Sequence, residues 1–247
     1  MKIFSLMLGI FSFSVFLGLS VTSSLRHEEE KQEIRSAFKN YFSPQILEAI
    51  LLDPNRLESQ RREVTIMFSD IRSFTSLSEN LPPQQMTRML HEYFDEMTEE
   101  VIATEGVVDK FIGDAIMAFW GAPIEQPDQA DRAVKAAKGM VKRLEKLKSK
   151  WASEGLPTLE IGIAINLGVA TVGNVGSKRR FDYTVIGDAV NVASRLEGFN
   201  KQFNSHIIIS DSTRRQLTID VETRDHGEVQ VRGRDEPIRI FEVRTEH

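Results

Sequence analysis

The chain has 247 residues, a formal net charge of −5 and no cysteine, and 41% of its residues are hydrophobic and 27% charged. The absence of cysteine excludes disulfide scaffolds, thiolate metal sites and cysteine nucleophiles. The mildly negative charge argues against nucleic acid as a partner, and the near-average composition predicts a folded globular core.

The N-terminus begins with an apolar stretch. The stretch from Ile3 to Val21 contains no charged residue. As a helix, it would be long enough to cross a bilayer. A cleaved signal peptide is the alternative, but its apolar core would be shorter and followed by a small-residue cleavage site. Basic residues after this stretch outnumber the single Lys2 before it, which favours a cytoplasmic location for the globular region. We expect a single-pass cell-membrane anchor over residues 1–25.

Residues 26–59 are expected to form a helical linker. Between Glu28 and Phe42 the few apolar residues recur at helical spacing, and Ser43 followed by Pro44 is typical of the start of a second short helix. The stretch is either a spacer between membrane and domain or a dimerising linker that carries a signal. The pattern leaves both interpretations open.

The first part of the globular region, 60–247, contains a strand, a helix and a hairpin. Residues 63–70 alternate between apolar and polar, as a strand does, and Pro83 opens a helix with regularly spaced apolar residues. Residues 107–112 and 115–120 are typical of two strands joined through Gly113 and Asp114, a pair that suits a two-residue turn. Asp114 is therefore expected at the tip of a hairpin.

The second part continues with a helix over 130–151 and strands over 159–172 and 181–186. Gly187 and Asp188 are then expected to begin a helix that runs to about Phe203. This order of elements predicts a mostly antiparallel α+β sheet with helices on one face.

Asp70 and Asp114 each stand where a predicted strand ends. If the first strand pairs with the hairpin, both carboxylates meet at one edge of the sheet. Hard cations such as Mg²⁺ bind carboxylate oxygens and share substrate phosphates, so the pair is a candidate metal site. An aspartate after a strand also serves as an ordinary turn former, and the spacing alone does not decide between these roles.

Three segments together resemble the class III adenylyl and guanylyl cyclase catalytic domain. They are FSDIRSFT at 68–75, FIGDA at 111–115 and DYTVIGDAVNVASR at 182–195. The resemblance covers about residues 60–244 and implies a ferredoxin-like βαββαβ core with extra C-terminal strands and helices. It also implies a homodimer that converts ATP into 3′,5′-cyclic AMP and pyrophosphate at sites shared between the two chains.

The resemblance assigns the metal site to one chain, and the base-binding and transition-state groups to the other. Asp70, Asp114 and the Ile71 carbonyl would bind two Mg²⁺ or Mn²⁺ ions per site. From the partner chain, Asn191 would orient the ribose and Arg195 would stabilise charge on the α-phosphate. These two residues are four apart and so share one helix face.

The remaining implied residues bind the substrate. Backbone amides around Phe74 and Thr75 would hold phosphates, and Arg179 and Arg232 are weaker candidates for the same task. The purine base would be selected by two further residues, Lys110 and Thr184.

Lys110 matches the lysine that selects adenine over guanine in the family it resembles, and Thr184 stands where many relatives carry Asp. This combination resembles a subgroup that includes bicarbonate-responsive enzymes, so bicarbonate is a candidate regulator. A guanylate cyclase and a catalytically silent nucleotide-sensing module remain alternatives. The five histidines show no ligand spacing, and there is no P-loop.

Overall fold

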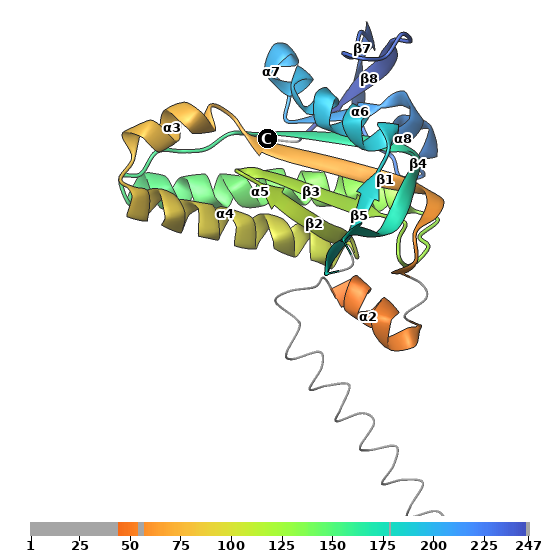
Figure 1. Ribbon diagram of the computed structural model, residues 1–247. Coiled ribbons are helices and arrows are strands. Elements are labelled where there is room, and N and C mark those ends of the chain that lie inside the picture. Colours follow the sequence, from red (N-terminus) through yellow and green to blue (C-terminus); the bar gives the residue numbers. More distant parts are fainter. Residues whose placement is uncertain (1–43, 54–56, 178, 246–247) are drawn as a thin grey trace, which may run out of the picture. The chain divides into compact units, whose positions relative to one another are not determined.

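The structure is a computed structural model that describes residues 44–53, 57–177 and 179–245 (Figure 1). The expected membrane anchor and most of the expected linker lie outside these residues. Among the residues described, no helix combines the length and the apolar character needed to cross a membrane.

The described helices and strands agree closely with the predicted order. In chain order they are α2 Pro44–Leu52, β1 Gln60–Ile71, α3 Phe74–Asn80, α4 Pro83–Ala103, β2 Val107–Ile112, β3 Ala115–Trp120, α5 Gln129–Ser153, β4 Ile161–Ser177, β5 Arg180–Ile186, α6 Asp188–Glu197, α7 Phe199–Phe203, β6 Ile207–Ser210, α8 Asp211–Gln216, β7 Thr223–Val229 and β8 Ile238–Val243.

The central strand is β1, which pairs antiparallel with β3 along one edge and with β4 along the other. Since β2 pairs antiparallel with β3, the first four strands lie in the order β2-β3-β1-β4. With helices between β1 and β2 and between β3 and β4, this is the predicted ferredoxin-like βαββαβ core. The sheet continues from β4 through β6, which runs parallel to it, to β8 and β7. These are the predicted extra C-terminal strands.

One face of the sheet is covered by α4 and α5 (Figure 1). Their apolar residues recur every three or four positions and pack against Met67 and Ile71 of β1 and Ile163 of β4. The buried residues of α4 are Met86, Met89, Tyr93, Met97 and Val101. This packing fixes the centre of the sheet, so the backbone positions at the ends of its strands are fixed as well.

The opposite face of the sheet is also covered by a helix. The alternation of β1 sends Val64, Ile66 and Phe68 to this face, where Ala189 and Ala193 of α6 pack against the same cluster. The prediction that the helices lie on one face is therefore wrong. The physical reason is that β1 is apolar on both faces, and each apolar face must be buried against another element.

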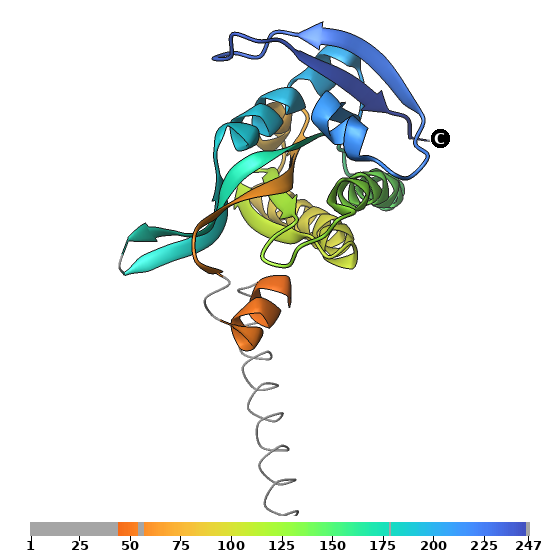
Figure 2. The same cartoon turned by 90° about the vertical axis from the view of Figure 1, so that its right-hand side faces the viewer.

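The β4–β5 hairpin brings a distant segment against the β2–β3 hairpin. β5 pairs with β4 from Ile186 opposite Thr171 to Arg180 opposite Ser177, and Figure 2 shows the end of this hairpin extending out from the sheet. Tyr183 of β5 nonetheless packs in the core, with its ring centroid 6.2 Å from that of Phe119 in β3. The residues next to Tyr183 are thereby placed close to β2.

The helix expected from Asp188 to Phe203 is divided. α6 ends at Glu197, Gly198 caps it, and α7 begins at Phe199. The apolar pattern continues through the break, so periodicity alone does not reveal it. Gly198 itself keeps a helical conformation, with φ −58° and ψ −23°.

Candidate functional site

Asp70 and Asp114 meet at one edge of the sheet, as predicted. Asp70 is near the end of β1, and Asp114 follows Gly113 in the turn between β2 and β3. The backbone of Gly113 has a φ of 66°, which glycine adopts without strain and which allows the tight reversal. Since Ser69 pairs with Ile116 across β1 and β3, the turn lies beside the end of β1. The carboxyl groups of the two aspartates share a hydrogen bond.

The protein alone leaves these two acids poorly compensated. Burial, and then the hydrogen bond and the negative charge of Asp114, raise the pKa of Asp70 to about 6. The backbone N–H of Ile71 donates to Asp70 Oδ1 at 3.1 Å and opposes this rise. The negative charge of a neighbouring carboxylate makes ionisation of Asp70 less favourable. A bound cation would remove that penalty.

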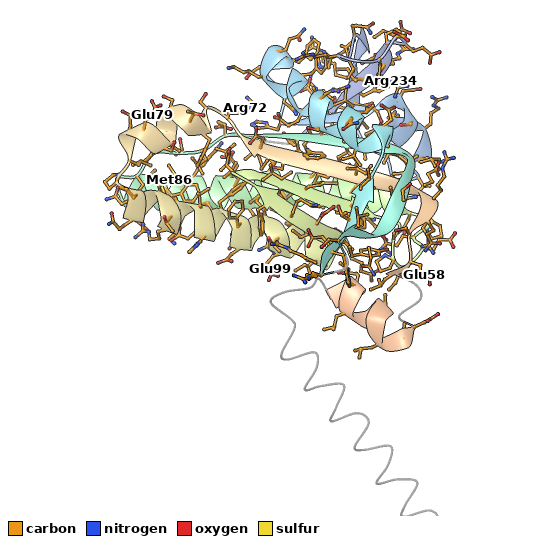
Figure 3. The ribbon with its side chains drawn as sticks, viewed as in Figure 1. Glu58, Arg72, Glu79, Met86, Glu99 and Arg234 are labelled. Carbon is orange, nitrogen blue, oxygen red and sulfur yellow. The ribbon has the colours of Figure 1, made fainter. Side chains whose placement is uncertain are left out.

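Glu197, at the end of α6, is a third acid that the sequence did not identify. Burial, followed by the charge of Asp70, raises the pKa of Glu197 to about 7, while Arg72 opposes the rise and Asp114 adds to it. Figure 3 shows Arg72 at the junction of β1 and α3. Gly162 pairs with Asp70 across the sheet, and a side chain there would clash with Glu197. We refer to Asp70, Asp114 and Glu197 as the acidic edge.

The geometry of the acidic edge suits an ion that is shared with a substrate. Within the described ranges, no group of three or more His, Cys, Asp or Glu side chains is arranged to hold a metal ion by itself. Mg²⁺ usually takes only one or two protein carboxylates and completes its shell with water and substrate phosphates. Asp70 and Asp114 match that donor set.

Lys110 and Thr184 are also brought together, although they lie on different hairpins. Lys110 Nζ donates to Thr184 Oγ1 at 3.2 Å. The hydroxyl of Thr184 in turn donates to Asp109 Oδ2 at 2.5 Å, and Lys110 Nζ lies 3.1 Å from Asp109 Oδ1. We refer to these three residues as the Asp109 cluster. Asp109 was not singled out in the sequence.

The carboxyl group of Asp109 is compensated within the protein. Its side chain is 0% exposed, and burial raises its pKa. The hydrogen bond from Thr184 and the charge of Lys110 act in the opposite direction. The Asp109 cluster is therefore a hydrogen-bonded unit with a fixed arrangement of donors and acceptors.

Asn191 and Arg195 are exposed on α6, as their spacing predicted. The guanidinium of Arg195 donates to the carbonyl of Arg232, so these two predicted residues lie together. Near them, Arg234 pairs with Asp188 at 2.7 Å. Among the contacts of the described residues, neither Asn191 nor Arg195 touches Asp70 or Asp114 within the same chain.

Besides Arg232, which lies beside Arg195, the predicted phosphate-binding residues occupy two further places. Phe74 and Thr75 begin α3, directly after the left-handed residue Ser73, which has a φ of 57°. Arg179 lies in the turn between β4 and β5, where its backbone N–H donates to Ser177 Oγ at 3.3 Å. In the part of the chain that is described, Arg179 makes no contact with the other predicted site residues.

Comparison with known proteins adds an independent finding. Residues 57–243 match the family described as Adenylate and Guanylate cyclase catalytic domain. Adenylate cyclase 1 of Rhizobium meliloti (strain 1021) is 40% identical over 183 residues, which are 74% of this chain and 28% of that protein. The chain thus spans less than a third of the length of this relative.

Solved structures share the fold. The adenylyl cyclase CyaB from P. aeruginosa superposes with a TM-score of 0.70 at 39% identity, covering 77% of this chain and 98% of that one. The guanylyl cyclase Cya2 superposes with a TM-score of 0.69 at 36% identity, covering 76% of this chain and 94% of that one. The chain is therefore similar both to a protein named as an adenylyl cyclase and to one named as a guanylyl cyclase.

Proposed function

Because this chain belongs to the class III adenylate and guanylate cyclase catalytic domain family, we propose that it is an adenylate cyclase. It would form 3′,5′-cyclic AMP and pyrophosphate from ATP at sites shared across a homodimer. The observation that carries the proposal is the pairing of Asp70 and Asp114 at the sheet edge, where buried like charges favour a bound cation. The names of the bacterial relatives support the choice of reaction.

Enzymes of this family generally depend on divalent metal ions. Asp70, Asp114 and the Ile71 carbonyl would hold two Mg²⁺ or Mn²⁺ ions in each site. When bound, such ions supply positive charge that favours the ionised 3′ hydroxyl of ribose and the departing pyrophosphate. The donor set fits this task, since both side chains offer carboxylate oxygens.

Asn191 and Arg195 would act on a substrate held by the partner chain. Asn191 would orient the ribose, and Arg195 would donate to the α-phosphate as charge develops there. Preorganised donors of this kind stabilise a transition state strongly. Both residues are exposed on α6 and do not touch the acidic edge of their own chain in the described residues, which supports a shared site.

A second copy of the chain would also bury apolar surface. Several large apolar side chains of the described residues are about half exposed: Phe111 49%, Ile112 52%, Val169 51%, Phe181 59% and Ile186 50%. They belong to or flank β2, β4 and β5. Exposed apolar surface of this extent is typical of protein interfaces.

Lys110 and Thr184 would recognise the adenine ring. The lysine donates to the ring nitrogen, and the threonine oxygen accepts from the amino group. Backbone amides at Phe74 and Thr75, together with Arg179 and Arg232, are proposed contacts of the triphosphate.

The test is product identification. The purified 247-residue chain is incubated with ATP or GTP in the presence of Mn²⁺ or Mg²⁺, and the products are separated by chromatography. Cyclic AMP from ATP is the expected result. Cyclic GMP as the main product would favour the guanylate cyclase alternative, which the similarity to Cya2 supports. Nucleotide binding without turnover would favour the silent module.

We also propose that the chain is anchored in the cell membrane with its catalytic domain in the cytoplasm. The uncharged stretch from Ile3 to Val21 and the basic residues after it support this location. Fractionation of cells that express the chain, with and without residues 1–25, tests the proposal.

Bicarbonate is proposed as a regulator. The combination of Lys110 and Thr184 is the sole support for this role, and adding bicarbonate to the activity assay tests it.

A further inference from the structure

The hydroxyl group of Thr184 is held in one orientation. A threonine hydroxyl has one hydrogen to donate and two lone pairs that accept. Its hydrogen is directed to Asp109 Oδ2 at 2.5 Å, a length typical of a hydroxyl bound to a carboxylate. Lys110 Nζ donates to the same hydroxyl oxygen at 3.2 Å. The oxygen of Thr184 therefore has acceptor capacity left and no hydrogen left to give.

We propose that Asp109 determines purine selectivity by holding the hydroxyl hydrogen of Thr184, so that this oxygen can only accept from the base. The inference rests on the proposed adenylate cyclase function. Asp109 need not touch the substrate; it is a positioning residue that acts through Thr184.

The local backbone explains how Asp109 reaches Thr184. Neighbouring strand residues normally point to opposite faces of a sheet. The ladder between β2 and β3 shifts register here, since Val108 pairs with Ala118 but Lys110 pairs with Met117. Asp109 is the extra residue of this β-bulge. Bulges beside active sites redirect a side chain, and this one lets Asp109 and Lys110 both reach Thr184.

The burial of Asp109 agrees with such a role. The carboxyl group is fully covered, and among the described residues its Oδ1 atom has no hydrogen-bond partner. Its compensation is the ion pair with Lys110 at 3.1 Å. An ionised carboxylate only accepts hydrogen bonds, so it fixes the direction of the bond from Thr184.

The consequence for the base comes from hydrogen-bond polarity. Adenine presents an amino donor beside a ring acceptor, whereas guanine presents a carbonyl acceptor beside a ring N–H donor. An acceptor at Thr184 and a donor at Lys110 match adenine at both positions. A threonine free to rotate could instead donate to the guanine carbonyl, and the preference would weaken.

The experiment compares the selectivity of the unmodified chain with that of Asp109→Asn, an isosteric change whose amide can also donate. Both are assayed for kcat/KM with ATP and with GTP, and for binding of each nucleotide by calorimetry. The preference for ATP over GTP should fall by about ten- to a hundredfold, the usual value of one well-placed base contact. Asp109→Ser is made in parallel in case the amide is not tolerated in the buried site.

Further variants separate positioning from general damage. Thr184→Val, which removes the hydroxyl, should lower the preference as much as Asp109→Asn does, and combining the two changes should lower it no further. Thr184→Ser should retain the preference. Asp225→Asn serves as the matched control, because Asp225 pairs with Arg239 at the far end of the sheet.

The outcomes distinguish the two proposals. If the chain prefers ATP in binding but makes no cyclic nucleotide, the proposed function fails, and the binding ratios of the variants still decide the role of Asp109. If Asp109→Asn lowers activity with both nucleotides equally and leaves the ratio unchanged, Asp109 is merely structural and the inference is wrong. An unmodified chain with no preference for ATP would also overturn it.

Discussion

The acidic edge and the Asp109 cluster both contain buried carboxyl groups, but the neighbouring side chains shift the pKa in opposite directions. In both, burial is the largest cause that raises a carboxyl pKa. At the acidic edge the neighbouring acids raise the pKa further, whereas in the Asp109 cluster Thr184 and Lys110 oppose the rise. The acids of the first region repel one another, whereas the carboxyl group of the second region is compensated by its own neighbours. In the proposed function, the first region would hold metal ions and the second would recognise an uncharged base.

The largest expected effect comes from removing a carboxylate of the acidic edge. Asp70→Asn should lower cyclase activity by about a thousandfold, because bound metal ions contribute several kcal/mol to catalysis. The same change should raise the Tm of the metal-free protein, since it removes a repulsive charge. Activity assays and thermal melts of the variant and of Asp225→Asn measure both effects. A fully active Asp70→Asn chain would contradict the metal role.

Loss of Arg195 should have the next largest effect. Arg195→Ala should lower activity by about a hundred- to a thousandfold, as removal of one preorganised donor does. Each shared site would take Asp70 from one chain and Arg195 from the other. Mixing Arg195→Ala chains with Asp70→Asn chains should therefore restore about a quarter of full activity. That value is expected if half of the dimers are mixed and each has one intact site. An inactive mixture of variants that still dimerise would exclude shared sites.

Metal binding should depend on pH. Protons and cations compete for Asp70, and its pKa of about 6 means that the proton wins increasingly below that pH. Mn²⁺ or Mg²⁺ should therefore raise the Tm clearly at about pH 8 and little at about pH 5. Thermal melts with and without the ion measure this difference. An equal rise at both values of pH would mean that the ion binds elsewhere.

The smallest expected effect concerns Glu197. Its pKa is raised from 4.5 to about 7, so its favourable contribution to stability is complete below about pH 4.5 and is lost as the pH rises through about 7. Glu197→Gln should therefore stabilise the metal-free protein at about pH 8 and not at about pH 4.5. After allowance for solvent screening, about 1 kcal/mol is expected, or about 2–4 °C in Tm. A gain of equal size at both values of pH would exclude ionisation as the cause.

Much of the fold and of the candidate site could be predicted from local sequence. The bounds of β2 and β3 agree with the prediction because Gly113 and Asp114 are typical turn residues between two alternating segments. The meeting of Asp70 and Asp114 was predictable once β1 was paired with this hairpin. Lys110 and Thr184 were predicted through the family resemblance, and the structure brings them into contact.

The rest depended on contacts that local patterns do not contain. Asp109 faces Thr184 only because of a β-bulge, and nothing in the residues around it predicts that irregularity. Glu197 joins the acidic edge because it lies about opposite Arg195 around the helix and so faces the sheet. Which side of a helix meets which strand is decided by tertiary packing. The apolar pattern also runs through Gly198, which hid the break between α6 and α7.

The β2–β3 hairpin carries both Lys110 and Asp114, four residues apart on one short rigid unit. In a dimer with shared sites, Lys110 would face the nucleotide of one site while Asp114 faces the ion of the other. A ligand that displaces the hairpin at one site would thereby alter the second. Cooperativity between the two halves of the dimer would then need no separate relay, because the same turn of chain belongs to both.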